Sequence, residues 1–340
     1  MAMKQLIYQM ALQSILRHAA AEGRKEALFG RGYEHAKNVL PAFIRGDTFP
    51  HIQLEFPLAG DPFLDASMLY PQDSGRVRID SPTVAGTEGI IDWISDLPKD
   101  YQGILWGYEL DMGSSVLPMA GVHFQPWDHP ELAIQFCRLI GEEEKGRLYL
   151  SSVDRMPAGW EPVYFGIFRG RKDAPLRIGG YLGKEVRAAA ARSKEVIRQV
   201  FQKTGFTAYD DTMLEQLSLL LGEGVEGVDF QFDVLPDGSL AEKFSVDLML
   251  GIRGCETAKD AFNGGVYTSL RRSLEEWKII DDRLDMALDM TYTKKQKVLS
   301  EEGSVGYCMK LLLPSWLKVR WIHGRLQPAK FYCHVYALIR

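Results

Sequence analysis

Five pairs of strand-like segments, separated by helical stretches, recur along the chain and constrain its fold most strongly. Apolar and polar residues alternate in these segments, as in strands with one buried face. The predicted pairs are 51–58 with 64–70, 104–112 with 116–125, 162–169 with 175–182, 228–234 with 241–250, and 316–321 with 327–337. Strands joined as hairpins run antiparallel, so this order excludes a doubly wound parallel sheet.

Helical periodicity fills the gaps between the strand pairs. The predicted helical stretches are 3–40, 84–95, 130–142, 184–203, 211–221, 257–277 and 281–290. No linker rich in Ser, Gly or Pro interrupts the order. We therefore expect a single domain over residues 1–340, with residues 1–45 as an N-terminal helical segment.

Ten antiparallel strands with helices between the pairs close most economically into a barrel, because closure removes the sheet edges. The predicted fold class is α+β: a ten-stranded antiparallel barrel with helices packed outside. In this arrangement the apolar strand faces contact the helices and the opposite faces line the lumen. The alternative is an unrelated α+β enzyme whose strand pairs form two separate sheets.

The faces assigned to the lumen are polar and aromatic. The last strand places Lys330, Tyr332, His334 and Tyr336 on this face. The other assigned positions are His51, Gln53, Glu55, Arg177, Gly179, Tyr181, Asp229, Gln231, Asp233, Lys243, Ser245, Asp247, Met249, Lys318 and Arg320. A barrel of this size is too wide to be filled by apolar side chains, so such a lining indicates a reaction chamber. An edge hairpin with amphipathic side chains on the surface is the simpler alternative for the last strand pair.

Composition excludes several classes of function. The formal net charge is -5, which argues against general nucleic-acid binding. Cys137, Cys255, Cys308 and Cys333 show no C-x-x-C spacing, and the histidines show no metal-binding spacing, so we expect neither a disulfide framework nor a metal site. A cytoplasmic protein fits this pattern. No apolar run is long enough to span a bilayer.

The alternation of strand pairs and helices resembles the ABBA-type aromatic and peptide prenyltransferases, whose prenyltransferase barrel surrounds a central chamber. The resemblance covers about residues 45–340 and rests locally on Lys330-Phe331-Tyr332 and on Arg177 with Tyr181. In length and in the shape of the fourth strand pair, the chain looks nearest to the bacterial, cyanobactin-like enzymes that modify ribosomal cyclic peptides. The resemblance implies transfer of a short isoprenoid from its allylic diphosphate to an aromatic or nucleophilic side chain of a peptide or small molecule.

The resemblance also implies roles for individual residues. Positive charge on the leaving diphosphate would come from Arg177, Lys243, Lys318, Arg320 and Lys330. The rings of Tyr108, Tyr181, Tyr332 and Tyr336 would shield the allylic cation from water. Glu55 matches the position where several of these families place an acid that orients the acceptor and takes its proton. No cofactor is required, and magnesium is an optional one.

The chain also departs from this family's pattern. The first four predicted strands contribute no Lys or Arg to the lumen, although these enzymes usually spread basic residues more widely. The residues expected to contact the acceptor are Asp229, Asp233, Asp247 and His334. Either these acids hold a metal or a cationic acceptor, such as a guanidinium or an amine, or the chain is a related non-catalytic barrel that binds a peptide or small ligand during natural-product maturation.

Residues 281–285 spell the D-D-x-x-D motif of helical isoprenoid synthases. That fold is all-helical and needs a second acid-rich helix, whereas this chain is rich in predicted strands. We therefore interpret Asp281 as a helix N-cap followed by acids in the first turn.

Overall fold

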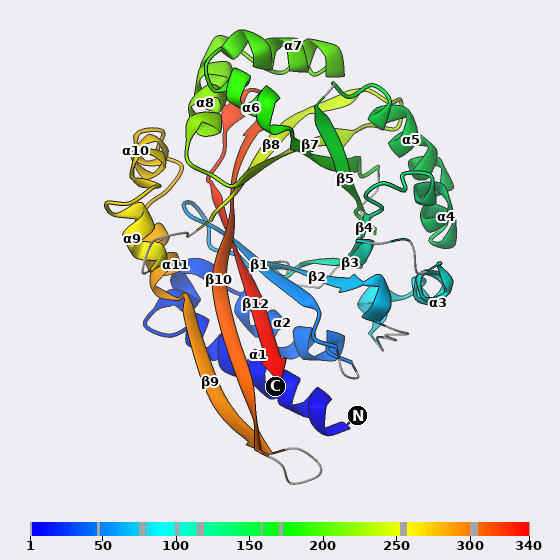
Figure 1. Cartoon of the computed structure of the whole chain (residues 1–340), viewed down its shortest axis with the longest axis vertical. Helices are drawn as coiled ribbons and strands as arrows, with labels where there is room; N and C mark the ends of the chain where they lie inside the picture. The colour runs from blue at the N-terminus through cyan, green and yellow to red at the C-terminus, as the bar shows by residue number, and fades with distance from the viewer. Residues whose placement is uncertain are drawn as a thin grey trace.

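Antiparallel pairing runs from strand to strand until the sheet closes on itself, as the computed structural model shows (Figure 1). The structure describes residues 2–45, 48–74, 79, 81–98, 101, 103–113, 119–157, 159–169, 173–251, 257–299 and 305–339. The predicted start of strand 116–125 and Cys255 lie outside these residues.

The strands of this sheet, apart from β9 and the two-residue β11, carry the apolar and polar alternation that the sequence predicts. Their bounds are β1 His51–Pro57, β2 Asp65–Pro71, β3 Leu105–Asp111, β4 Gly121–Gln125, β5 Trp160–Ile167, β6 Leu176–Leu182, β7 Gly227–Val234, β8 Leu240–Met249, β9 Tyr292–Leu299, β10 Val305–Ile322, β11 Arg325–Leu326 and β12 Lys330–Ile339.

Ten of these strands form the closed ring. β1 to β8 pair in sequence order, β8 pairs β10, β10 pairs β12, and β12 pairs β1. The predicted ten-stranded antiparallel barrel is therefore confirmed, and the alternative with two separate sheets is wrong. Closure places one face of every ring strand toward a common interior.

β10 extends well beyond the ring, which the sequence analysis did not predict. Its second half pairs β8, whereas its first half pairs β9, so β9, β10 and β12 continue as a projection (Figure 1). β9 carries Lys294, Lys295 and Lys297, all exposed, and lacks the apolar alternation of a half-buried strand. Lysines on an edge strand discourage pairing with another chain.

The helices surround the outside of the barrel (Figure 1). Their bounds are α1 Ala2–Ala19, α2 Gly32–Val39, α3 Glu88–Asp96, α4 Leu132–Leu139, α5 Glu143–Val153, α6 Lys184–Ala190, α7 Lys194–Thr204, α8 Asp211–Gly222, α9 Ala258–Phe262, α10 Thr268–Glu276 and α11 Arg283–Asp289, with a π-helix at Lys25–Phe29 and 3-10 turns at Leu40–Phe43, Gln72–Ser74 and Pro82–Val84. Within the described residues, no helix is both long and apolar enough to cross a membrane.

Three of the predicted helical stretches are interrupted, and one helix was missed. Stretch 3–40 divides into α1, the π-helix Lys25–Phe29 and α2. Stretch 184–203 divides into α6 and α7 because Ser193 is extended, with φ -153°. Stretch 257–277 divides into α9 and α10 around Gly264, with φ +157°. α5 follows α4 directly, although the prediction ended at residue 142.

The hydrophobic core lies between the helices and the outer face of the barrel. Phe124 of β4 stacks on Phe136 of α4 with ring centroids 4.3 Å apart, and Phe201 of α7 meets Phe244 of β8 edge to face at 5.0 Å. These four rings are fully buried. Since the helices cover the apolar strand faces, the opposite faces are left to line the interior.

The D-D-x-x-D segment lies at the start of α11. Asp281 is not the N-cap; its carboxylate accepts a hydrogen bond from the backbone N–H of Arg283 at 3.0 Å, and Asp282 occupies the N-cap position without a side-chain cap. Asp285 forms an ion pair with Arg271 at 2.9 Å. These contacts are structural, and none of the three acids lines the barrel cavity.

Gly107 of β3 gives a test of this packing. A Cβ atom there would lie 1.8 Å from the backbone oxygen of Met68 in the neighbouring strand β2, so Gly107→Ala is expected to lower the free energy of unfolding by about 2 kcal/mol or more. Gly121→Ala in β4 is the matched control, because its Cβ would lie 3.4 Å from its nearest atom. Urea unfolding measures both variants, and equal losses would contradict the packing.

Candidate active site

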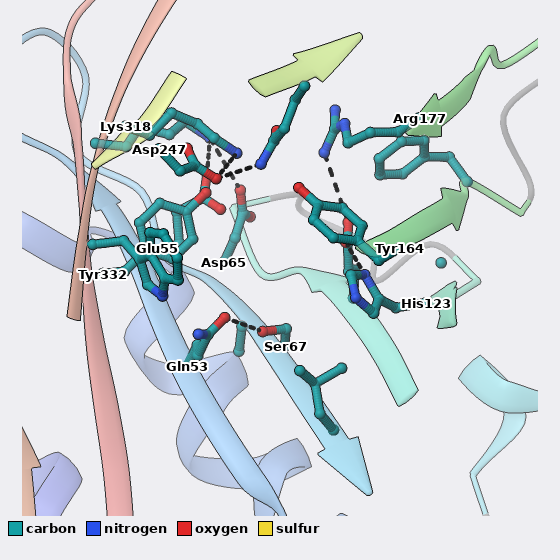
Figure 2. A pocket seen from close by; sticks show the side chains of 18 of the residues that line it. Gln53, Glu55, Asp65, Ser67, His123, Tyr164, Arg177, Asp247, Lys318 and Tyr332 are labelled. Atoms are coloured by element: carbon teal, nitrogen blue, oxygen red, sulfur yellow. Dashed lines mark hydrogen bonds and ion pairs between the residues drawn. The ribbon is translucent and has the colours of Figure 1, made fainter. Parts of the chain in front are cut away.

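A polar cavity of about 350 Å³ occupies the interior of the barrel (Figure 2). It lies within the size range of pockets for small ligands. The predicted site residues that line it are Glu55, Arg177, Tyr181, Asp229, Lys243, Asp247, Lys318, Arg320, Lys330 and Tyr332. Four other predicted site residues, Tyr108, Asp233, His334 and Tyr336, are not among its lining.

Tyr108 points away from the chamber, so its predicted place in the lumen is wrong. It lies on the outer face of β3, fully buried, with its ring 5.6 Å from that of Phe43. Its hydroxyl is 2.8 Å from the hydroxyl of Thr87. Burial raises its pKa to about 12, and it belongs to the core between the barrel and the helices.

His334 and Tyr336 lie on the interior face of β12 but beyond the cavity. The side-chain amide of Gln53 donates to Nε2 of His334, so the neutral ring carries its proton on Nδ1, 2.8 Å from the hydroxyl of Tyr336. Burial, aided by the nearby ring of His51, lowers the pKa of His334 to about 4. His334 is therefore neutral at pH 7, and both its nitrogens have partners.

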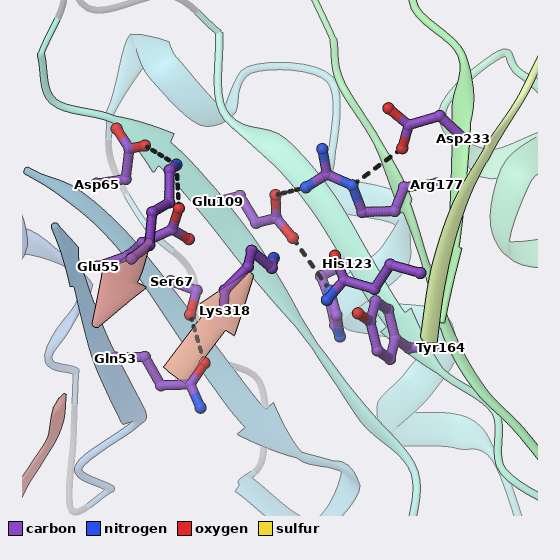
Figure 3. A network of polar contacts seen from close by, with 12 residues as sticks. Gln53, Glu55, Asp65, Ser67, Glu109, His123, Tyr164, Arg177, Asp233 and Lys318 are labelled. Carbon is purple, nitrogen blue, oxygen red and sulfur yellow. Dashed lines mark hydrogen bonds and ion pairs between the residues drawn. The ribbon is translucent and has the colours of Figure 1, made fainter. Parts of the chain in front are cut away.

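The first cluster of charges in the chamber joins β1, β2 and β12 (Figure 3). Glu55 lies opposite Asp65 on β2 and opposite Tyr332 on β12. The ammonium of Lys330 binds the carboxylate of Glu55 and lies 3.7 Å from Asp65.

This shared ammonium separates the two carboxyl pKa values. Burial alone would raise the pKa of Glu55, but Lys330 and then Lys318 outweigh burial and lower it. Burial and the charge of Glu55 raise the pKa of Asp65 to about 7. Asp65 is therefore the stronger base of the pair.

The second cluster surrounds Arg177 on β6 (Figure 3). Its guanidinium lies 3.2 Å from Asp233 on β7 and 3.9 Å from Glu109 on β3. Lys243 of β8 donates to the same Asp233. Burial, followed by the neighbouring Arg177, lowers the pKa of Lys243 to about 8.

The third cluster pairs two carboxylates across β7 and β8. Asp229 lies directly opposite Asp247. Asp229 accepts hydrogen bonds from the Tyr164 hydroxyl at 2.9 Å and the Gly180 N–H at 2.6 Å, whereas Asp247 lies 3.5 Å from the ammonium of Lys318. Burial raises both pKa values, that of Asp247 to about 6, and the charge of Asp247 raises that of Asp229 further.

Arg320 differs from Arg177, Lys243, Lys318 and Lys330 of the lining, as does Arg169, whose buried Nη1 also has no hydrogen-bond partner among the described residues. Within the described part of the chain Arg320 forms no ion pair with a carboxylate, and its buried Nε has no hydrogen-bond partner. It lies on β10 opposite Ser245 of β8; Lys318 is two positions away along β10, and Lys243 is two positions from Ser245 along β8. Acidic and basic side chains are otherwise balanced around the cavity: Glu55, Asp65, Glu109, Asp111, Asp229 and Asp247 against Arg169, Arg177, Lys243, Lys318, Arg320 and Lys330.

Several chamber residues were not predicted from the sequence. They include Asp65, Glu109, His123, Tyr164, Arg169 and Trp316. Asp65 and Glu109 share a strand face with other interior residues, so alternation extended to β2 and β3 would have found them. Trp316 shares a face of β10 with Lys318 and Arg320, so alternation would also have found it, whereas Tyr164 lies at a register shift of β5. Among the described residues, no group of three His, Cys, Asp or Glu side chains is placed to hold a metal ion.

Asp65 provides a test through pH. Its folded pKa of about 7 lies above the value near 3.9 of an unfolded Asp, so its contribution to stability is present below pH 4 and is lost as the pH rises towards 7. Asp65→Asn should therefore stabilise the protein, relative to wild type, by about 1–3 kcal/mol more at pH 8 than at pH 4.5.

Asp237→Asn is the control for this experiment. Asp237 accepts hydrogen bonds from Ser239 in an exposed turn, and these lower its pKa, so its variant should gain no stability at pH 8. Urea unfolding at the two pH values measures both variants. A gain for Asp65→Asn that does not change with pH would contradict the assignment.

No family model matches the sequence, and no curated protein matches it. Solved structures do match over almost the whole chain. The 5-dimethylallyltryptophan synthase from Streptomyces coelicolor is 12% identical with a TM-score of 0.51, covering 98% of this chain and 97% of the other. The apo prenyltransferase PriB is 15% identical with a TM-score of 0.54, covering 96% and 95%. A ternary complex of PriB with L-tryptophan and dimethylallyl thiolodiphosphate is 14% identical, with a TM-score of 0.54 and the same coverage.

Identities of this size show the fold alone. The expected architecture is confirmed: helices outside a closed ten-stranded antiparallel barrel, with a chamber at its centre, are common to this chain and to these aromatic prenyltransferases. The chain therefore has the prenyltransferase-barrel fold.

Proposed function

We propose that the protein is a prenyltransferase, which moves a short isoprenoid from its allylic diphosphate to an aromatic or other nucleophilic group of a peptide or small molecule. The observation that carries the proposal is the cavity inside the barrel, where Arg320 presents a guanidinium that has no carboxylate partner among the described residues and lies beside further basic and aromatic side chains. The solved structures of similar fold support it, since one holds a dimethylallyl diphosphate analogue with tryptophan and another holds product diphosphate.

The diphosphate binds where basic residues of neighbouring strands converge. Lys243 on β8 faces the cavity, as do Lys318 and Arg320 on the adjacent β10. Arg177 lies close to Lys243, because both form ion pairs with Asp233. When the C–O bond of the allylic diphosphate breaks, the electron pair stays with the diphosphate. The guanidinium and ammonium groups stabilise that charge without giving up protons, so magnesium is optional.

Aromatic rings flank the place where the allylic cation forms. The ammonium nitrogen of Lys318 lies 5.3 Å from the ring centroid of Tyr332. The rings of Tyr181 and Trp316 are stacked, with their centroids 6.3 Å apart. These electron-rich faces stabilise a cation and keep water from it. Tyr336 is farther along β12, outside the cavity, so this role falls to Tyr181 and Tyr332.

Glu55 and Asp65 have different roles toward the acceptor: Glu55 orients it, and Asp65 accepts its proton. The lowered pKa of Glu55 makes it a weak base, so it accepts a hydrogen bond from the acceptor and orients it. The new bond joins the acceptor to the first carbon of the isoprenoid, and the proton that the acceptor loses passes to Asp65, the stronger base. Lys330 holds both carboxylates in place rather than binding diphosphate.

We place the enzyme in the cytoplasm, in the maturation of ribosomal peptides. Chain length and the shape of the hairpin β7–β8 support this subtype. The competing function is a non-catalytic barrel that binds a peptide or small ligand. The near balance of acidic and basic residues around the cavity favours that alternative, because a balanced chamber attracts a trianion less strongly.

Arg320 and Lys330 are expected to respond differently to substitution. Arg320→Ala should lower kcat/KM with dimethylallyl diphosphate by a factor corresponding to about 2–4 kcal/mol, by analogy with loss of one oxyanion donor, and should leave folding intact.

Lys330→Ala should instead lower the free energy of unfolding by about 3 kcal/mol, because it leaves Glu55 and Asp65 without their counter-ion. Glu55→Gln should lower kcat and leave diphosphate affinity nearly unchanged.

Calorimetry with dimethylallyl S-thiolodiphosphate measures binding, and mass spectrometry of prenylated acceptors measures turnover. Arg198→Ala is the control, since Arg198 pairs with Glu195 and Asp211 on the outer surface and should affect neither quantity. A protein that binds no allylic diphosphate analogue but retains its fold is the non-catalytic barrel, and the proposed function is then wrong.

A further inference from the structure

Two carboxylates face each other in the chamber, where their mutual repulsion destabilises the folded protein. Asp229 and Asp247 are directly opposite on β7 and β8, with only 5% and 7% of their surfaces exposed. Like charges in this position destabilise a sheet, and burial increases the cost. Within the described residues, the contacts of Asp229 are neutral donors, and Lys318 is the ammonium paired with Asp247.

The same wall of the cavity holds acceptor atoms without donors. Oδ1 of Asp247 and Oε1 of Gln231 are buried and have no hydrogen-bond partner, although Nε2 of Gln231 donates to the other oxygen of Asp247. Both residues are more than nine-tenths buried, and both line the cavity. A buried acceptor without a donor destabilises the fold, so these atoms are placed for a ligand that brings donors.

Aromatic rings surround these acceptors. Tyr164 lies flat against His123, with ring centroids 4.6 Å apart, and reaches Asp229 with its hydroxyl. A Cβ atom at Gly179 would lie 2.2 Å from the ring of Tyr164, so glycine at this position lets the ring cover the strand. Tyr181 and Trp316, stacked at 15° to each other, complete the lining. Ring faces next to carboxylates form a site for a nitrogen cation.

We propose that Asp229, Asp247 and Gln231 bind a cationic nitrogen group of the acceptor, an ammonium or a guanidinium. The inference rests on the proposed function and names the class of acceptor: a cationic small molecule, or a peptide with a cationic side chain. A bound cation relieves the repulsion between the two carboxylates and donates to Oδ1 of Asp247 and Oε1 of Gln231. A shared proton would relieve the repulsion but leave the glutamine oxygen without a donor.

The positions of the charged residues in the chamber are consistent with separate sites for the diphosphate and for the cationic acceptor. Lys243 and Arg320 lie on the diphosphate side, Asp229 lies opposite Tyr181, and Lys318, opposite Asp247, stands between the two sites. Asp233, which the sequence analysis grouped with these acids, is occupied by Arg177 and Lys243 and takes no part. A cationic acceptor beside an anionic donor also offsets the charge that the diphosphate brings into the chamber.

Two matched pairs of probes test the proposal in calorimetry with protein saturated by dimethylallyl S-thiolodiphosphate. The pairs are Nα-acetyl-arginine amide with Nα-acetyl-citrulline amide, and tryptamine with N-acetyltryptamine. In wild type, at least one cationic member should bind about tenfold or more tightly than its neutral partner, as expected for charge-assisted hydrogen bonds. Asp229→Asn and Asp247→Asn should remove this preference, and Asp233→Asn should retain it.

The possible outcomes distinguish a failure of the proposed function from a failure of the cationic-acceptor proposal. Failure to bind the diphosphate analogue removes the proposed function. Binding of the analogue with equal affinity for the two members of both pairs, or with no detectable binding of any probe at millimolar concentration, overturns the cationic acceptor. A preference that survives in both Asp→Asn variants also overturns it. Loss of the preference in 1 mM MgCl₂ makes the acidic pair a metal site instead. If the variants do not fold, the wild-type comparison alone decides.

Discussion

Compensation of buried charge inside a closed sheet is the constraint on which the rest of this structure depends. The outer face of the barrel packs into the hydrophobic core, so charged residues of β1 to β3, β6 to β8, β10 and β12 meet in one cavity. Each ion removed from bulk water is costly unless a partner or a ligand compensates it. Lys330 with Glu55, Arg177 with Asp233, and Lys318 with Asp247 meet this demand within the chain.

The groups that are not compensated are the ones that indicate ligands. Among the residues that the structure describes, Arg320 has no carboxylate partner, Asp247 has the ammonium of Lys318, and Asp229 has only neutral donors, so the chamber has a site for an anion and a site for a cation. An allylic diphosphate and a cationic acceptor fit these two sites together. The pKa values of Glu55 and Asp65 move in opposite directions because both contact Lys330, which separates a carboxylate that orients from a carboxylate that accepts a proton.

The sequence predicted the fold to the extent that period-2 alternation was strong. It located all ten ring strands and the face of each residue on β1, β6, β7, β8 and β12, which brought Glu55, Arg177 and Asp247 to the cavity. It failed at Tyr108, which was assigned by its aromatic ring; Glu109 faces the cavity, so alternation along β3 turns its neighbour Tyr108 outward, where it contacts Thr87. β9 was missed because its lysines show no buried face. Ion pairs such as Arg177 with Asp233 depend on pairing across strands, which alternation within one strand does not reveal.

Proton uptake on binding of the diphosphate analogue tests the central claim, that a trianion enters this charge-compensated chamber. A trianion raises the pKa of nearby carboxyl groups, and Asp65 and Asp247, with pKa values of about 7 and 6, are poised to take up protons at pH 7. Calorimetry with dimethylallyl S-thiolodiphosphate in buffers of different ionisation enthalpy measures this uptake. The account predicts binding with a net uptake of protons. Binding heats that do not depend on the buffer, or the absence of binding, would contradict it.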